Sequence, residues 1–211
     1  MATTEPTVAE AVVLFQELEQ RFPSTTLGGD RWYILAPEYS TADARKALMR
    51  RLREALLKLV SVVGVPKPLE AIFSIAAVEK PEDRDMSFSR ETWQSGPENL
   101  ARGRNWLSQI YRHNHAATEN VLAAHKDFMW ISEEITYGLY LSDHSIIGPV
   151  ETELVVLTGI MMQNLVRETG WHLRGIRRIG IERVAAFCGL ALNRVPRVAD
   201  IEHEVPFDSG A

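Results

Sequence analysis

Apolar residues recur at three- and four-residue steps through nearly the whole chain, and this periodicity limits the possible folds more than any other feature. One clear series places five such residues on a single helical face: Leu48, Leu52, Leu56, Leu59 and Val63. That spacing is typical of an amphipathic helix. No segment shows the strict apolar–polar alternation of a half-buried strand. The sequence therefore predicts an all-α fold.

Proline, glycine and N-cap residues divide this pattern into separate helices. Ser40 or Thr41 suits the N-cap of a helix that ends at Gly64, and Pro149 suits the first position of another. A first helix is predicted from Val8 to about Pro23. One further helix is predicted to begin at Pro68. The remaining predicted helices cover 98–114, 117–139, 149–162, 167–180 and 181–193.

The most polar connection, residues 80–97, is the best candidate for a boundary between two halves of the chain. We predict an N-terminal helical part, 1–95, and a second helical region, 96–211, which together form one domain. Residues 53–57 weakly resemble residues 153–157. This similarity leaves a duplicated helical unit as an alternative organisation.

Charge and hydropathy exclude several classes of protein. The net charge of −5 argues against a nucleic-acid-binding protein. The cluster Arg45, Lys46, Arg50 and Arg53 is accordingly predicted to be a solvated helix face. No window approaches the roughly 18 uncharged apolar residues of a membrane span. Neither end of the sequence shows a sorting signal, so we expect a cytoplasmic protein that binds no membrane.

Cys188 is the single cysteine of the chain, and this count excludes an intramolecular disulfide and disfavours a cysteine zinc site. The residue lies in the apolar run 184–190, where a small buried side chain fits well. The HExxH, GxSxG, Walker and GxGxxG motifs are all absent. We therefore expect no metal and no cofactor.

The histidines are the natural candidates for acid–base chemistry. His113 and His115 are two residues apart, so they cannot hold one metal as a helical i, i+4 pair would. His144, in the loop 142–145, is a candidate to line a pocket, although an ordinary loop residue is the alternative. His172 has the most suggestive setting. Glu168 precedes it by one turn, and Gly175 leaves space beside its ring for a helix or a ligand.

Glu153 lies among apolar residues of the predicted helix 149–162, where a carboxylate needs a partner. His172 would be a suitable one, because a carboxylate holds an imidazole in one tautomer and favours its protonated form. Two interpretations stay open. The pair either serves proton transfer, or it is a buried ion pair that only fixes the packing of two helices.

Several short motifs resemble the carboxymuconolactone decarboxylase and alkylhydroperoxidase D (AhpD-like) superfamily. They are Asp127-Phe128, Tyr137-Gly138, Glu151–Leu157, Trp171–Gly175 and Gly180. The resemblance covers 102–211, is weaker over 1–95, and is greatest to fungal AhpD-like proteins, several of which accompany secondary-metabolite pathways. It implies an AhpD-like helical bundle that assembles into a homo-oligomer, a trimer or a hexamer.

The peroxidase branch of this superfamily carries the pattern E-x11-C-x2-C-x3-H. When the histidine of the pattern is placed on His172, its glutamate falls on Glu153 and its two cysteines fall on Leu165 and Glu168. A dithiol mechanism needs two sulfurs within bonding reach. The resemblance therefore disfavours a thiol peroxidase, and peroxide handling through Cys188 is left as an alternative.

The decarboxylase branch lacks the two cysteines, and it implies cofactor-independent acid–base chemistry on a small lactone or keto acid. On this resemblance His172 would be the proton shuttle and Glu153 its orienting partner. Arg174 would anchor a substrate carboxylate, with His144 as a second binding candidate. The alternative is a catalytically silent helical oligomer in which Glu153 and His172 form a structural tie.

Overall fold

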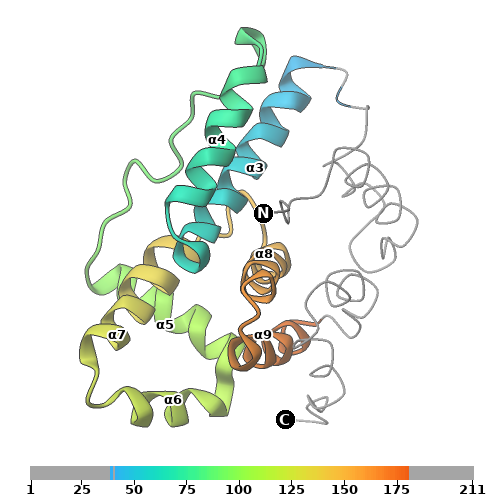
Figure 1. The fold of residues 1–211 in the computed structure, drawn as a ribbon. Coiled ribbons are helices and arrows are strands. Elements are labelled where there is room, and N and C mark those ends of the chain that lie inside the picture. The colour runs from blue at the N-terminus through green and yellow to red at the C-terminus, as the bar shows by residue number, and fades with distance from the viewer. Residues whose placement is uncertain (1–38, 40, 181–211) are drawn as a thin grey trace.

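The computed structural model describes Tyr39 and residues 41–180, and this part of the chain is all-α, as predicted (Figure 1). No strand occurs among these residues. The predicted helices from Val8 and over 181–193, together with Cys188, lie outside the described residues. The α-helices are α3 (Ala42–Val63), α4 (Pro66–Val78), α5 (Pro97–Tyr111), α6 (His115–Leu122), α7 (Lys126–Trp130), α8 (Pro149–Met162) and α9 (Val166–Arg178). The structure also contains two 3-10 helices, η2 (Pro81–Asp83) and η3 (Arg112–Asn114), and a π-helix, η4 (Ile131–Leu141).

The ends of α3 follow directly from its sequence. The Thr41 hydroxyl accepts a hydrogen bond of 3.2 Å from the backbone N–H of Ala44, and Gly64 ends the helix with φ of 80°. Glycine reaches that positive φ without the steric cost that other residues meet. Pro149 begins α8, which confirms that prediction too. None of the helices in the described ranges combines the length and the apolar character needed to cross a membrane.

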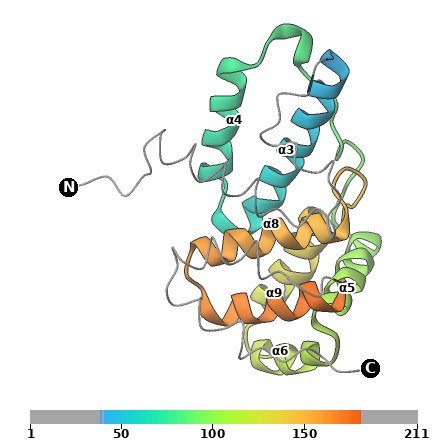
Figure 2. The same ribbon diagram turned by 90° about the vertical axis from the view of Figure 1, so that its right-hand side faces the viewer.

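Two pairs of helices organise the described part of the molecule. Figure 2 shows α3 and α4 side by side, with α8 and α9 running alongside each other below them. α3 also packs against α8, and α5 packs against both η4 and α9. A helix of the predicted N-terminal part thus packs directly on a helix of the second region. The boundary at 95/96 stays a prediction.

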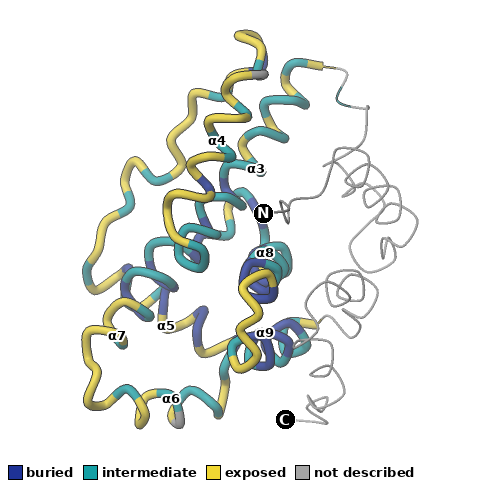
Figure 3. The backbone as a smooth tube through the Cα atoms, in the orientation of Figure 1, coloured by how far each residue is buried: buried dark blue, intermediate teal, exposed yellow. Residues whose placement is uncertain are grey.

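The buried core lies where α5, η4 and α8 meet, and Figure 3 shows buried positions concentrated in α5, α8 and α9. α5 and η4 approach closely because glycines face each other. A Cβ on Gly103 would overlap the backbone of Glu133 and Gly138. The core cluster comprises Trp106, Leu107, Ile110, Tyr137, Leu141, Val156 and Ile160.

The single helix predicted over 117–139 is wrong. α6 ends at Leu122, where the carbonyl accepts a 2.7 Å hydrogen bond from the backbone N–H of His125. The chain continues as the short α7 and then as a π-helix, whose last turn is closed by a 2.9 Å bond from Ser142 N–H to Tyr137 O. Neither proline nor glycine marks these changes in the sequence, so periodicity alone did not reveal them. π-Helical segments occur often at functional sites.

The basic face of α3 is paired with acids from the connection between α4 and α5. Arg45 contacts Asp83 at 2.8 Å, and Asp85 receives both Arg50 at 2.9 Å and Arg53 at 2.7 Å. The guanidinium of Arg50 holds the pKa of Asp85 well below its usual range. These arginines therefore fix the long connection to α3.

Candidate functional site

Glu153 and His172 come from the two helices α8 and α9 and meet in the interior. The Nδ1 atom of His172 lies 2.8 Å from Oε2 of Glu153. Glu153 is completely buried and His172 is 5% exposed. The structure therefore brings together the two residues that the sequence spacing selected, nineteen positions apart.

The hydrogen bond assigns different tasks to the two ring nitrogens of His172. Nδ1 faces the carboxylate, so Nε2 is the nitrogen left to exchange a proton with a ligand. The second oxygen of Glu153, Oε1, is buried and has no hydrogen-bond partner among the described residues. Such an unsatisfied buried carboxylate oxygen is uncommon in a folded protein.

The ring of Tyr111 packs against the imidazole and against two further aromatic rings. The ring of Tyr111 lies 6.1 Å from that of His172, 6.2 Å from Tyr137 and 5.9 Å from Trp171, measured between centroids. Burial raises the pKa of Tyr111 to about 12 and that of Tyr137 well above its usual value. Both phenols therefore stay protonated near neutral pH. The Tyr137 hydroxyl is buried and forms no close hydrogen bond in the described ranges, although it interacts with the hydroxyl of Tyr111.

A cavity of about 240 Å³ opens beside His172. Its wall is mostly apolar and is built from α3, α5, η4, α8 and α9. Leu165 and Glu168, the two positions aligned with the cysteines of the peroxidase pattern, line this same cavity. Its size fits a small organic molecule rather than a large cofactor.

The space expected beside His172 at Gly175 is occupied by a neighbouring helix. A Cβ on Gly175 would collide with the side chain of Ile110 from α5. Of the two uses predicted for this gap, a helix or a ligand, the structure shows the helix. The ligand space lies on another side of the ring, towards Glu168.

Arg174 does not line the cavity of His172. It lines a second and larger cavity, of about 640 Å³, together with Arg167, Trp171 and His115. Neither Arg167 nor Arg174 forms an ion pair with another described residue. Tyr111 lines both cavities.

His144 does not line the cavity of His172 either. Its ring packs edge-on against Trp106, with centroids 4.5 Å apart, and its Nε2 is buried without a partner in the described part. Burial, together with the charge of Lys58, lowers the pKa of His144 to about 4. The structure therefore gives His144 the surroundings of a neutral packed side chain, and its assignment as a binding residue stays a prediction.

The sequence did not reveal a buried charge network next to His144. Lys58 is fully buried and donates to the carbonyls of Asp143, Leu141 and Tyr140 at 2.6, 3.2 and 3.3 Å. Its neighbour Glu54 accepts two bonds from Arg90, at 2.6 and 2.7 Å. The i, i+4 spacing of Glu54 and Lys58 was the available signal, but that pattern is usually exposed.

The chain is distantly similar to a known protein. No family model matches the chain. It is similar to "Peroxisomal protein 2" of Schizosaccharomyces pombe, at 26% identity over 148 residues, which cover 67% of each chain. No solved structure matches.

Proposed function

We propose that this chain is a cofactor-independent, carboxymuconolactone-decarboxylase-like enzyme that acts on a small organic acid or secondary-metabolite intermediate. The observation that carries the proposal is the buried hydrogen bond between Glu153 and His172 at the wall of a cavity. The occupants of the two cysteine positions, Leu165 and Glu168, line that cavity as well. This arrangement supports proton transfer and offers no dithiol.

The pair suits one specific task, which is to protonate a carbon. During decarboxylation of a lactone or keto acid, the bond to the departing carboxylate breaks and CO₂ leaves. The electron pair of that bond passes to the neighbouring carbonyl as an enolate. His172, protonated on Nε2, then gives its proton to the carbon, while Glu153 holds the ring and offsets its charge. The neutral hydroxyl of Tyr137 can donate to the enolate oxygen.

Arg174 keeps a role only for a ligand that extends past Tyr111. Its cavity adjoins that of His172 at the Tyr111 ring. A ligand in the smaller cavity alone would not reach the guanidinium. The proposed carboxylate anchor therefore applies to a substrate that spans both spaces, and Arg167 offers a second cation there.

Assembly and location are part of the same proposal. We infer a homo-oligomer, a trimer or hexamer, from the superfamily resemblance, and the exposed apolar side chains of α4 support it: Leu69 is 43% and Phe73 60% exposed. The cytoplasmic location stays a prediction. The name of the fission-yeast relative makes the peroxisome the specific alternative.

The test is turnover of small lactone and keto acids by variants of the pair, followed by CO₂ release. We expect His172→Gln to lower the rate by about 10²- to 10⁴-fold, because general acid–base catalysis contributes an effect of this size. Glu153→Gln should lower it less, since the imidazole remains. The matched control is His113→Gln, which changes an exposed histidine outside both cavities.

Circular dichroism must show that each variant is folded before rates are compared. Unchanged turnover in folded His172→Gln would contradict the proposal and leave the pair as a structural tie between α8 and α9. Loss of the titratable thiol of Cys188 on exposure to modest peroxide would favour the peroxide-handling alternative.

A further inference from the structure

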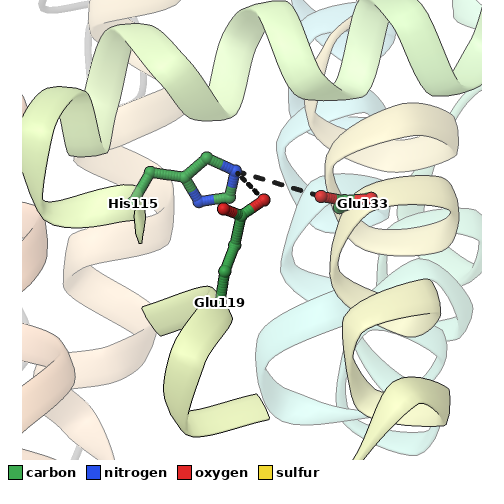
Figure 4. Close-up of side chains that lie close together, drawn as sticks. All are labelled: His115, Glu119 and Glu133. Atoms are coloured by element: carbon green, nitrogen blue, oxygen red, sulfur yellow. Dashed lines mark ion pairs between the residues drawn. The ribbon is translucent and has the colours of Figure 1, made fainter. Parts of the chain in front are cut away.

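We propose that His115, Glu119 and Glu133 form a binding site for a divalent transition-metal ion at the edge of the larger cavity (Figure 4). His115 Nε2 lies 3.5 Å from Oε1 of Glu119 and 3.9 Å from Oε1 of Glu133. The three ligand atoms all lie within 4.8 Å of one another. This site was not expected from the sequence, which predicted no metal.

Two elements bring the three side chains together. His115 and Glu119 are one turn apart on α6 and therefore point to the same side of that helix. Glu133 projects from the π-helix η4, and Figure 4 shows its carboxylate facing the imidazole. The ligands thus approach a common point from two directions, as a three-ligand metal site requires.

A fourth residue orients the most buried ligand. Arg104 of α5 contacts Oε2 of Glu133 through Nε at 3.0 Å and Nη2 at 2.9 Å. This leaves Oε1 for His115 and an ion. Outer-shell hydrogen bonds of this kind fix the orientation of metal ligands and are themselves part of metal sites.

The charges around the site favour a cation. Two carboxylates and one guanidinium together carry a net charge of −1 around the imidazole of His115, and the side chain of Glu133 is only 5% exposed. A divalent ion would compensate this charge. Protonated His115 could do so as well, and an ion-pair cluster without metal is therefore the alternative that the experiment must separate.

The ligand types indicate which ions fit. One imidazole and two carboxylates suit Mn²⁺, Fe²⁺ or Zn²⁺, whereas Mg²⁺ and Ca²⁺ prefer oxygen ligands alone. An ion about 2.0–2.2 Å from each ligand draws the three atoms to roughly 3–3.5 Å apart. Glu119 can make most of this adjustment, because its side chain is 47% exposed.

The position of His115 on the cavity wall gives the ion a use beyond structure. Catalytic metal sites hold three protein ligands and keep a coordination position open to a ligand or water. The same cavity contains Arg167 and Arg174. An ion there would add a third cationic group, so the class of ligand that fits is an organic anion.

The test uses tag-free, full-length protein that has been stripped with a chelator. Binding of Zn²⁺ is measured by competition with a chromophoric chelator, and binding of Mn²⁺ by the loss of its free-ion EPR signal. We expect one ion per chain. His115→Ala, Glu119→Gln and Glu133→Gln should each weaken binding by about tenfold or more, because each substitution removes one ligand of the metal ion.

Matched controls separate this site from other acids and histidines. His113→Ala and Glu98→Gln change exposed residues that do not belong to the cluster, and they should leave the affinity unchanged. Glu133→Gln keeps an oxygen for Arg104, so it should fold even if His115→Ala does not. His172→Gln should also bind metal normally, which keeps this test independent of the proposed decarboxylase function.

Two results would overturn the proposal. The first is the absence of Zn²⁺ and Mn²⁺ binding at millimolar concentration in folded protein, which would leave an ion-pair cluster. The second is equal affinity in the parent chain and in all three ligand variants, which would place the ion elsewhere.

Discussion

At the scale of single residues, Lys58 shows how a charge can be kept inside this protein. The C-terminal carbonyls of a helix lack partners within that helix. Lys58 supplies one from outside: it donates to Tyr140 and Leu141, the last carbonyls of η4, and to Asp143 just beyond. The buried ammonium thus caps a helix to which it does not belong. Burial lowers its pKa to about 8.

This buried lysine should make stability depend on pH in alkaline solution. Its pKa is about 8 in the folded protein and 10.5 as the ordinary value. Between these values the unfolded chain binds more protons than the folded one, so the free energy of unfolding rises with pH. We expect a gain of about 2 kcal/mol from pH 8 to 10 relative to Lys58→Met. Urea unfolding at several pH values measures it.

The exposed Lys67 provides the control for that series. Lys67→Met should keep the pH dependence of the parent chain, because its ammonium is solvated in both states. The prediction is wrong if the parent chain and Lys58→Met show the same dependence of stability on pH between about 8 and 10. That result would mean that folding does not lower the pKa of Lys58.

The sequence allows a contact between two residues to be predicted only where their positions in the helical pattern are unusual. Glu153 and His172 were chosen because a carboxylate in an apolar helix needs a partner, and the structure places them 2.8 Å apart. Lys58 lies directly before Leu59 of the apolar series, at a position that is usually exposed in an amphipathic helix. The metal cluster of His115 was not predictable, because the i, i+2 spacing of His113 and His115 is not that of a metal pair and Glu133 reaches His115 only through the fold.

At the scale of secondary-structure elements, α5 and η4 pack with almost no space between their backbones. Gly103 lacks room for a Cβ because the backbone of η4 lies against it. Side chains can rotate away from an added methyl group, but backbone cannot. This contact fixes the π-helix, and with it Glu133 and Tyr137.

Gly103→Ala should therefore destabilise the protein although alanine favours helices. We expect a loss of about 1–3 kcal/mol, typical of overpacking, from the midpoint of chemical denaturation. Gly159→Ala is the matched comparison, since its Cβ would meet only the side chains of Leu59 and Val62. It should cost less. A Gly103→Ala variant as stable as the parent would mean that α5 and η4 can separate.

The beginnings of helices were more predictable than their continuity. Thr41, Gly64 and Pro149 mark local backbone requirements, and each was located correctly from the sequence. The break at Ala123–His125 and the π-helix carry no such local mark. The π-helix η4 packs closely against α5, and such a long-range contact cannot be read from a one-dimensional pattern.

At the scale of the whole molecule, α4 is an apolar helix with little cover. Among the described helices it packs chiefly against α3. Val65, Leu69 and Phe73 follow one another at four-residue steps and are 55%, 43% and 60% exposed. An apolar stripe of this kind is typical of an interface, and a second copy of the chain is the proposed occupant.

Sedimentation or light scattering should accordingly give a mass of three or six times 23.8 kDa. Phe73→Glu should shift the protein to smaller species without unfolding it, because a buried charge at an interface is costly. Phe88→Glu, at another exposed phenylalanine outside α4, should not. A parent chain that elutes as a monomer would contradict the assembly proposed for α4.

Tyr111 lines two cavities, one with His172 in its wall and the other with Arg167 and Arg174. The size of the Tyr111 side chain therefore affects the volume that is open to a ligand in either cavity. We expect substitution of Tyr111 by a smaller residue to enlarge the space shared by the two cavities. Such a substitution would let the protein accept a larger ligand without a rearrangement of its helices.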